Sequence, residues 1–233
     1  MKIIDTKTGK RVGKEQKEIN LKLKEEDPIL RNASKQLDQD ELSPMDPPDA
    51  YEMNTPEVEE KATYHPLIQQ YMTEHESALQ VVEEFEKAMQ RFKEGGYRLD
   101  DSINDPLRKF FEFFENNLLD HNRREERQLF PLLHKRLIEC GEHSESEKPT
   151  TAIDMMEDDH VKFIQLGALV FNMLGLGARL PDMNSRMFTY DVAYDNAREL
   201  VETIKLHIYR EDNVLFPLAH KLITFEEMSI MTS

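Results

Sequence analysis

The chain has 233 residues, which is enough for one or two domains with a buried core. It carries 30 Lys and Arg against 46 Asp and Glu, and the formal net charge of −16 argues against nucleic-acid or anionic-membrane partners, because both need a basic surface. A single cysteine, Cys140, excludes an internal disulfide, and no stretch approaches the roughly 20 apolar residues of a membrane span, so we expect a cytoplasmic protein.

The first part of the chain, residues 1–60, differs from the rest. It is polar and weakly periodic, basic up to about residue 26 and mostly acidic afterwards, with four prolines between residues 44 and 56. Such a segment buries too little apolar surface to fold alone. We expect a polar N-terminal arm, and the sequence leaves open whether it is disordered or wraps along the rest of the protein.

From about residue 63 onward the apolar residues follow a helical period. A first helix is predicted to end at Gly95-Gly96. The sequence Asn104-Asp105-Pro106 is typical of a helix start, with a capping side chain before a proline, and predicts a second helix that ends at Gly141. Pro131 lies within this second pattern and predicts a kink or an end there.

Two further helices follow in the second half of the chain. The third is predicted to come after the polar loop 143–149 and to end in the Gly- and Pro-containing segment 175–181. The fourth is predicted to begin near residues 184–185. Four amphipathic helices with short or medium loops predict an all-α fold, an antiparallel up-down-up-down four-helix bundle over residues 61–224, followed by a C-terminal tail, residues 225–233.

The helical part of the chain repeats itself. Residues 121–137 align without gaps to residues 207–223, with nine identities in 17 positions, and both segments contain His-x-x-x-Glu followed by Leu-Phe-Pro. Two lone histidines, His75 on the first helix and His160 on the third, are separated by nearly the same offset. We therefore predict two similar helical hairpins, each supplying one lone His and one His-x-x-x-Glu.

The middle of each predicted apolar stripe carries ligand-type side chains. Residues four apart in a helix point the same way, so each His-x-x-x-Glu presents both groups to the core. Buried carboxylates cost several kcal/mol unless a cation compensates them, and a metal centre resolves this conflict. Imidazole and carboxylate without thiolate suit iron, manganese or zinc, and six ligands suit two metal ions better than one. The six candidates are His75, His121, Glu125, His160, His207 and Glu211.

These residues resemble the hemerythrin-like family, also called the HHE cation-binding domain, over about residues 62–223. The specific marker is the motif His-x-x-x-Glu with Leu-Phe-Pro after it, which occurs twice. The resemblance implies an oxo- or hydroxo-bridged di-iron centre in a four-helix bundle, with the four histidines as iron ligands and Glu125 and Glu211 as bridging carboxylates. It leaves open whether the two histidines of each half bind one iron or are split between both.

The sequence departs from the patterns of known hemerythrin-like proteins in two features. Oxygen-carrying hemerythrins have a fifth histidine, in a His-x-x-x-His pair on the third helix, but Met156 and Ile164 occupy the positions four residues before and after His160. Each iron would then keep one open position, as in the four-histidine di-iron proteins of the repair-of-iron-centres group, which are linked to nitrosative stress. The paired N-terminal cysteines frequent in that group do not occur here.

The resemblance implies a non-heme di-iron protein that binds O2 or NO for sensing, detoxification or stress response, with two iron ions favoured over manganese or zinc. One alternative is a store or donor of iron for iron–sulfur cluster repair, with an iron-acceptor or electron-transfer protein as partner. Another is an oxidoreductase acting on NO, O2 or peroxide, which the lack of an obvious general acid on the stripe disfavours. A zinc-bound or metal-free structural bundle is the remaining alternative. Tyr71, one turn before His75, is a candidate hydrogen-bond donor or redox-active group.

Overall fold

The computed structural model describes residues 63–144 and 147–231. Over these ranges the chain forms helices joined by loops and contains no strand, which confirms the all-α prediction for this part of the protein. The predicted N-terminal arm, residues 1–60, lies outside the described residues.

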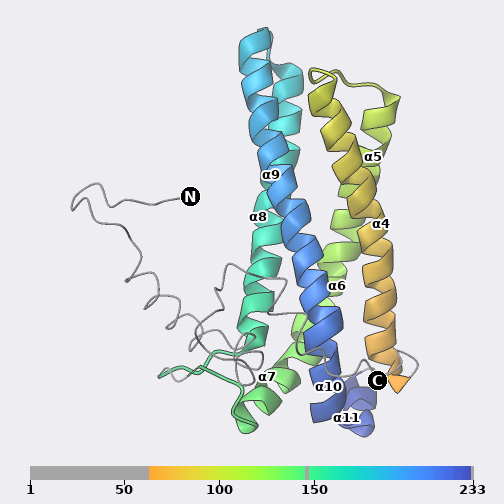
Figure 1. The fold of residues 1–233 in the computed structure, drawn as a ribbon, viewed down its shortest axis with the longest axis vertical. Coiled ribbons are helices and arrows are strands. Elements are labelled where there is room, and N and C mark those ends of the chain that lie inside the picture. The colour runs from red at the N-terminus through yellow and green to blue at the C-terminus, as the bar shows by residue number, and fades with distance from the viewer. Residues whose placement is uncertain (1–62, 145–146, 232–233) are drawn as a thin grey trace, which may run out of the picture.

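The long helices lie alongside one another (Figure 1). In chain order the elements are α4 (Pro66–Glu94), α5 (Asp101–Phe113), the π-helical turn η2 (Phe114–Leu118), α6 (Leu119–Arg127), α7 (Leu129–Glu139), α8 (Ala152–Arg179), α9 (Met183–Arg210), the π-helical turn η3 (Glu211–Leu215), α10 (Phe216–Leu222) and α11 (Phe225–Met231). Helix α8 packs along α9, and α4 packs against both α5 and α9. The helices α7, α10 and α11 gather at one end, where α11 occupies the segment expected to be a tail and buries Met228.

The second predicted helix begins earlier than expected. Helix α5 starts at Asp101, so Pro106 lies inside it instead of opening it. A proline within a helix leaves the carbonyl four residues earlier without its usual donor. Here that carbonyl belongs to Ser102, and the side chain of Arg91 on α4 donates to it at 3.1 Å. This tertiary hydrogen bond lets the helix run through the proline.

The same predicted helix is not continuous. The π-helical turn η2 separates α5 from α6, and the chain breaks again at Gln128 before α7. Pro131, three residues after this break, has no N–H to continue the helix. In the second half, η3 comes directly before α10, which has Pro217 in its first turn. The interruption predicted at Pro131 is therefore present, and a similar one precedes Pro217; each lies a few residues before its proline.

The third predicted helix ends within the expected segment, residues 175–181. Helix α8 runs through Gly175 and Gly177 and ends at Arg179. Gly177 is required by packing, because a Cβ atom at this position would lie 2.4 Å from the Tyr190 ring of α9. This glycine therefore permits a close helix–helix approach and does not itself end the helix. Helix α9 begins at Met183, close to its predicted start.

The apolar core consists of two clusters. One is centred on aromatic residues such as Phe85 and Phe110 and fills the half of the molecule that contains the α4–α5 and α8–α9 connections. The other contains Tyr71, Phe130 and Phe216 and fills the end near α7 and α10. Along α4, the second cluster ends at residue 72 and the first begins at residue 78. A layer of polar side chains lies between them.

Helix α8 is only partly covered. Two of its large apolar side chains, Ile164 and Phe171, are 51% and 60% exposed. Within the described residues, α8 is the one helix long and apolar enough to cross a membrane by length and composition, which corrects the expectation that no stretch approaches this limit. Those two criteria do not distinguish a membrane helix from a core helix, and α8 also contributes the buried His160 to the polar layer.

Candidate metal centre

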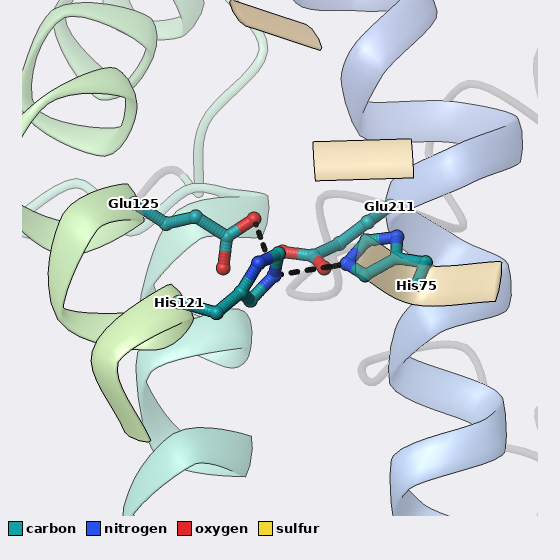
Figure 2. Close-up of side chains that lie close together, drawn as sticks. All are labelled: His75, His121, Glu125 and Glu211. Atoms are coloured by element: carbon teal, nitrogen blue, oxygen red, sulfur yellow. Dashed lines mark hydrogen bonds and ion pairs between the residues drawn. The ribbon is translucent and has the colours of Figure 1, made fainter. Parts of the chain in front are cut away.

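The polar layer brings together all six residues singled out in the sequence. They come from four separate stretches of helix and are buried, with both glutamates fully inaccessible to solvent. Figure 2 shows four of them pointing toward one another. The six are His75 on α4, His121 and Glu125 on α6, His160 on α8, His207 at the end of α9, and Glu211 at the start of η3.

The first set of ligand-type atoms comes from His75, His121 and the two glutamates. The Nε2 atoms of His75 and His121 face each other at 3.0 Å. Glu211 Oε2 lies 3.2 Å from His75 Nε2, and Glu125 Oε1 lies 3.3 Å from His121 Nε2. The four ligand atoms lie within 4.8 Å of one another, close enough to hold one metal ion.

The second set repeats this arrangement with the other two histidines. The Nε2 atoms of His160 and His207 are 3.1 Å apart. Glu211 Oε2 lies 3.2 Å from His207 Nε2, and Glu125 Oε2 lies 3.7 Å from His160 Nε2. Both glutamates therefore belong to both sets. In each set, the two histidines come from the same hairpin.

Each histidine of the cluster turns its other ring nitrogen, Nδ1, away from the centre toward a carboxylate. Such an outer carboxylate fixes the ring orientation and makes the imidazole a stronger metal ligand. Three of the four contacts are hydrogen bonds, and the fourth is longer. The pairs are His75 with Asp212 at 2.8 Å, His121 with Glu74 at 2.7 Å, His160 with Glu126 at 2.8 Å, and His207 with Asp159 at 3.5 Å.

The sequence-based analysis missed these outer carboxylates, although the repeat contains their signal. An acidic residue comes directly before each lone histidine and directly after each motif glutamate, in both halves. The repeat also places an arginine before each motif glutamate. Arg124 pairs with Glu74 at 2.5 Å, and Arg210 pairs with Asp159 at 3.3 Å. In each hairpin, an arginine thus contacts an outer carboxylate, and that carboxylate in turn lies beside an imidazole.

The residues present fit a metal cluster, because the centre has acceptors and lacks donors. An imidazole that donates from Nδ1 keeps a lone pair on Nε2 when it is neutral. The facing Nε2 atoms of His75 and His121 are then both acceptors. No hydrogen-bond donor among the described residues satisfies either oxygen of Glu125 or of Glu211. Only a shared cation, or protons taking its place, can balance such a site.

In the metal-free protein, neighbouring carboxylates favour the protonated form of three of the histidines. Burial alone would lower the pKa of His75, but the carboxylates of Asp212 and Glu211 raise it to about 10. Burial also opposes protonation of His121 and His207, and their carboxylate neighbours raise both pKa values to about 9. The pKa of Glu211 is held well below its usual range despite burial, mainly by His207. Burial and the charge of the neighbouring His207 lower the pKa of the remaining histidine, His160.

Tyr71 contacts the first set without joining it. Its ring lies 5.2 Å from the ring of His121, edge to face, and the side chain is fully buried. Its hydroxyl donates to Gln128 Oε1 at 3.1 Å instead of to a ligand-type residue. Burial and the nearby carboxylate of Glu125 raise the pKa of the Tyr71 phenol, which keeps it protonated. Its position beside the cluster agrees with the sequence, whereas a hydrogen bond to a candidate ligand is not formed.

Comparisons with protein-family models, with curated proteins and with solved structures found no match to this chain. The resemblance to the hemerythrin-like family therefore rests on the motifs and on the geometry described above. The geometry supports a buried His and Glu cluster able to hold metal ions and compatible with a hemerythrin-like centre.

Proposed function

We propose that the chain is a hemerythrin-like protein in which the six clustered residues bind two iron ions, each held by the two histidines of one hairpin and both sharing Glu125 and Glu211. The observation that carries this proposal is the shared pair of buried carboxylates with no donor, flanked by two pairs of inward Nε2 atoms. The long helices would then form an antiparallel four-helix bundle that encloses the two ions.

The proposed function is reversible binding of a small diatomic ligand, O2 or NO, for sensing or detoxification in the cytoplasm. Each metal position draws on two imidazoles and two carboxylates, and centres with two histidines and carboxylate leave coordination positions free for exogenous ligands. The chain contributes the ligand set, the outer carboxylates that orient it, and an apolar surrounding on both sides. On these two sides, the apolar clusters limit the access of water and protons to the centre, which favours binding over further reaction.

The first test is metal content followed by a visible spectrum. The protein is reconstituted with iron under anaerobic conditions, desalted, and analysed for iron per chain. We expect two iron ions per chain, and a spectral band that develops with O2 and reverses when O2 is removed. Reconstituted protein with less than one iron per chain would refute the metal assignment. A persistent ferric spectrum after one exposure to air would refute reversible O2 binding and leave NO as the ligand to test.

A double variant separates the centre from nonspecific iron binding. His75→Ala together with His160→Ala removes one histidine from each metal position. The half-buried His143 lies in a loop outside the cluster and provides the control, His143→Ala. We expect the double variant to lose both iron ions and the control to keep them. Equal iron retention by the double variant and the control would show that iron binds elsewhere.

A further inference from the structure

One cavity of about 200 Å³ reaches the first set of histidines from the surface. It lies between α4 on one side and η2 and α6 on the other. Its inner end is formed by His75 and His121, and its outer rim includes the exposed side chains of Asn116, Asn117 and Asp120. The cavity therefore connects solvent with two residues that are otherwise almost completely buried.

The internal repeat explains why this cavity belongs to the first half. Three residues after His75 the chain has Ala78, which lines the cavity, and three residues after His160 it has Phe163. Phe163 is fully buried, and its ring lies 5.0 Å from the ring of His207 and 6.0 Å from that of His160. At the second pair of histidines, an aromatic ring thus fills the position that a methyl group occupies at the first pair.

The facing walls also differ between the halves. The cavity wall opposite α4 contains the π-helical turn η2, which interrupts the helical hydrogen-bond pattern between α5 and α6. The corresponding residues of the second half, 200–204, are regular α-helix within α9. A π turn adds a residue to the helix and changes the direction of the side chains around it, and such turns are frequent at functional sites.

The chemistry of the cavity suits a divalent cation. Its rim offers carboxylate, amide and hydroxyl oxygens, from Asp120, Asn116 and Ser77, and Glu74 lies further along it beside His121. The one arginine among the lining residues, Arg124, is bound to Glu74 at 2.5 Å and to Asp120 at 3.3 Å. An incoming metal ion can replace Arg124 at these carboxylates, because ion pairs near the surface contribute little to stability.

We propose that this cavity is the route by which divalent metal ions load the centre, that the position between His75 and His121 fills first, and that the second position fills from it across the shared glutamates. The inference rests on the proposed two-metal centre and adds the order and direction of loading. Phe163 closes the direct approach to the second pair of histidines, so the two positions are filled in sequence.

Stopped-flow uptake of Co2+ by the full-length, metal-free protein tests this proposal, since Co2+ bound to His and carboxylate absorbs visible light. We expect two phases, of which the faster depends linearly on Co2+ concentration and the slower does not. Ala78→Phe is expected to slow the faster phase at least tenfold, with two ions per chain still bound at equilibrium. Leu79→Phe is the matched control, because it adds a ring at a neighbouring position that does not line the cavity.

Two other variants complete the experiment. Ser77→Phe adds a ring at an exposed position of the rim, and it tests the route even if Ala78→Phe does not fold. Phe163→Ala is expected to open the second position, so that the slower phase becomes concentration-dependent. Loading of Ala78→Phe and Ser77→Phe at the wild-type rate, with normal final content, would overturn the route and leave the centre intact. A wild-type protein that binds no Co2+ at equilibrium would overturn the centre itself, and the route with it.

Discussion

The outer carboxylates of the two halves can be compared directly, because their contacts with the histidines differ in length. Glu74 accepts a hydrogen bond from His121 Nδ1 at 2.7 Å, whereas the matching Asp159 lies 3.5 Å from His207 Nδ1, which has no hydrogen-bond partner among the described residues. Removal of an outer partner typically lowers metal affinity 10- to 100-fold, which is about 1.4 to 2.8 kcal/mol. We expect Glu74→Gln to fall in this range and Asp159→Asn to cost less than about threefold, because the longer contact contributes little.

The assay is a competition titration of Co2+ between the protein and a chromophoric chelator, which gives apparent dissociation constants for both metal equivalents. Glu83→Gln provides the control, since this exposed carboxylate on α4 forms an ion pair with Lys87 on the same helix and lies outside the cluster. Equal losses of affinity for Glu74→Gln and Asp159→Asn would refute the argument from hydrogen-bond length. So would a loss for Glu83→Gln as large as that for Glu74→Gln, which would show an effect of net charge alone.

Three further predictions address the buried charges, the packing and the shared ligands. Three histidines of the cluster have pKa values of about 9 to 10 in the folded metal-free protein, against 6.5 in an unfolded chain. Their contribution to the stability of the fold is therefore complete below pH 6.5 and is lost as the pH rises through 9 to 10. Thermal unfolding should therefore show a Tm that falls over this range for the metal-free protein; a constant Tm would contradict the protonated state. Gly167→Ala places a Cβ atom 2.6 Å from Phe114 and should lower the free energy of unfolding, measured by urea titration, by about 1 to 3 kcal/mol. Gly175→Ala is the control and should be neutral or stabilising, because the space around Gly175 is open. Glu125→Ala and Glu211→Ala should each reduce the content of both metal ions in elemental analysis, and full retention by both variants would disprove that they are shared ligands.

The composition of the candidate site could be predicted from the sequence because helix geometry constrains it. A histidine and a glutamate four residues apart must share a face, so each His-x-x-x-Glu motif is a local property of one helix. The repeat then indicates that two such faces meet, since His121 and His207 stand at matching positions of similar segments. Burial of a carboxylate on an apolar face is costly, and this physical conflict marks Glu125 and Glu211 as candidate ligands from their positions on the stripe alone.

Other features depended on tertiary contacts that no local pattern contains. The start of α5 could not be predicted, because the hydrogen bond that compensates Pro106 comes from Arg91 on another helix. The need for a glycine at residue 177 comes from the Tyr190 ring of α9. The π-helical turn η2 and the cavity beside it have no recognised signal in the residues that form them, so their place in the molecule could come only from the structure.

The outward hydrogen bonds of the imidazoles also have an entropic consequence. A ring held at Nδ1 cannot turn about its Cβ–Cγ bond without breaking that bond, so the orientations of His75, His121 and His160 are fixed when the chain folds. The cost of ordering these three side chains is then part of folding and does not reduce the free energy of metal binding. Among the residues that the structure describes, none provides such an anchor at His207 Nδ1, which makes His207 the least preorganised histidine of the cluster.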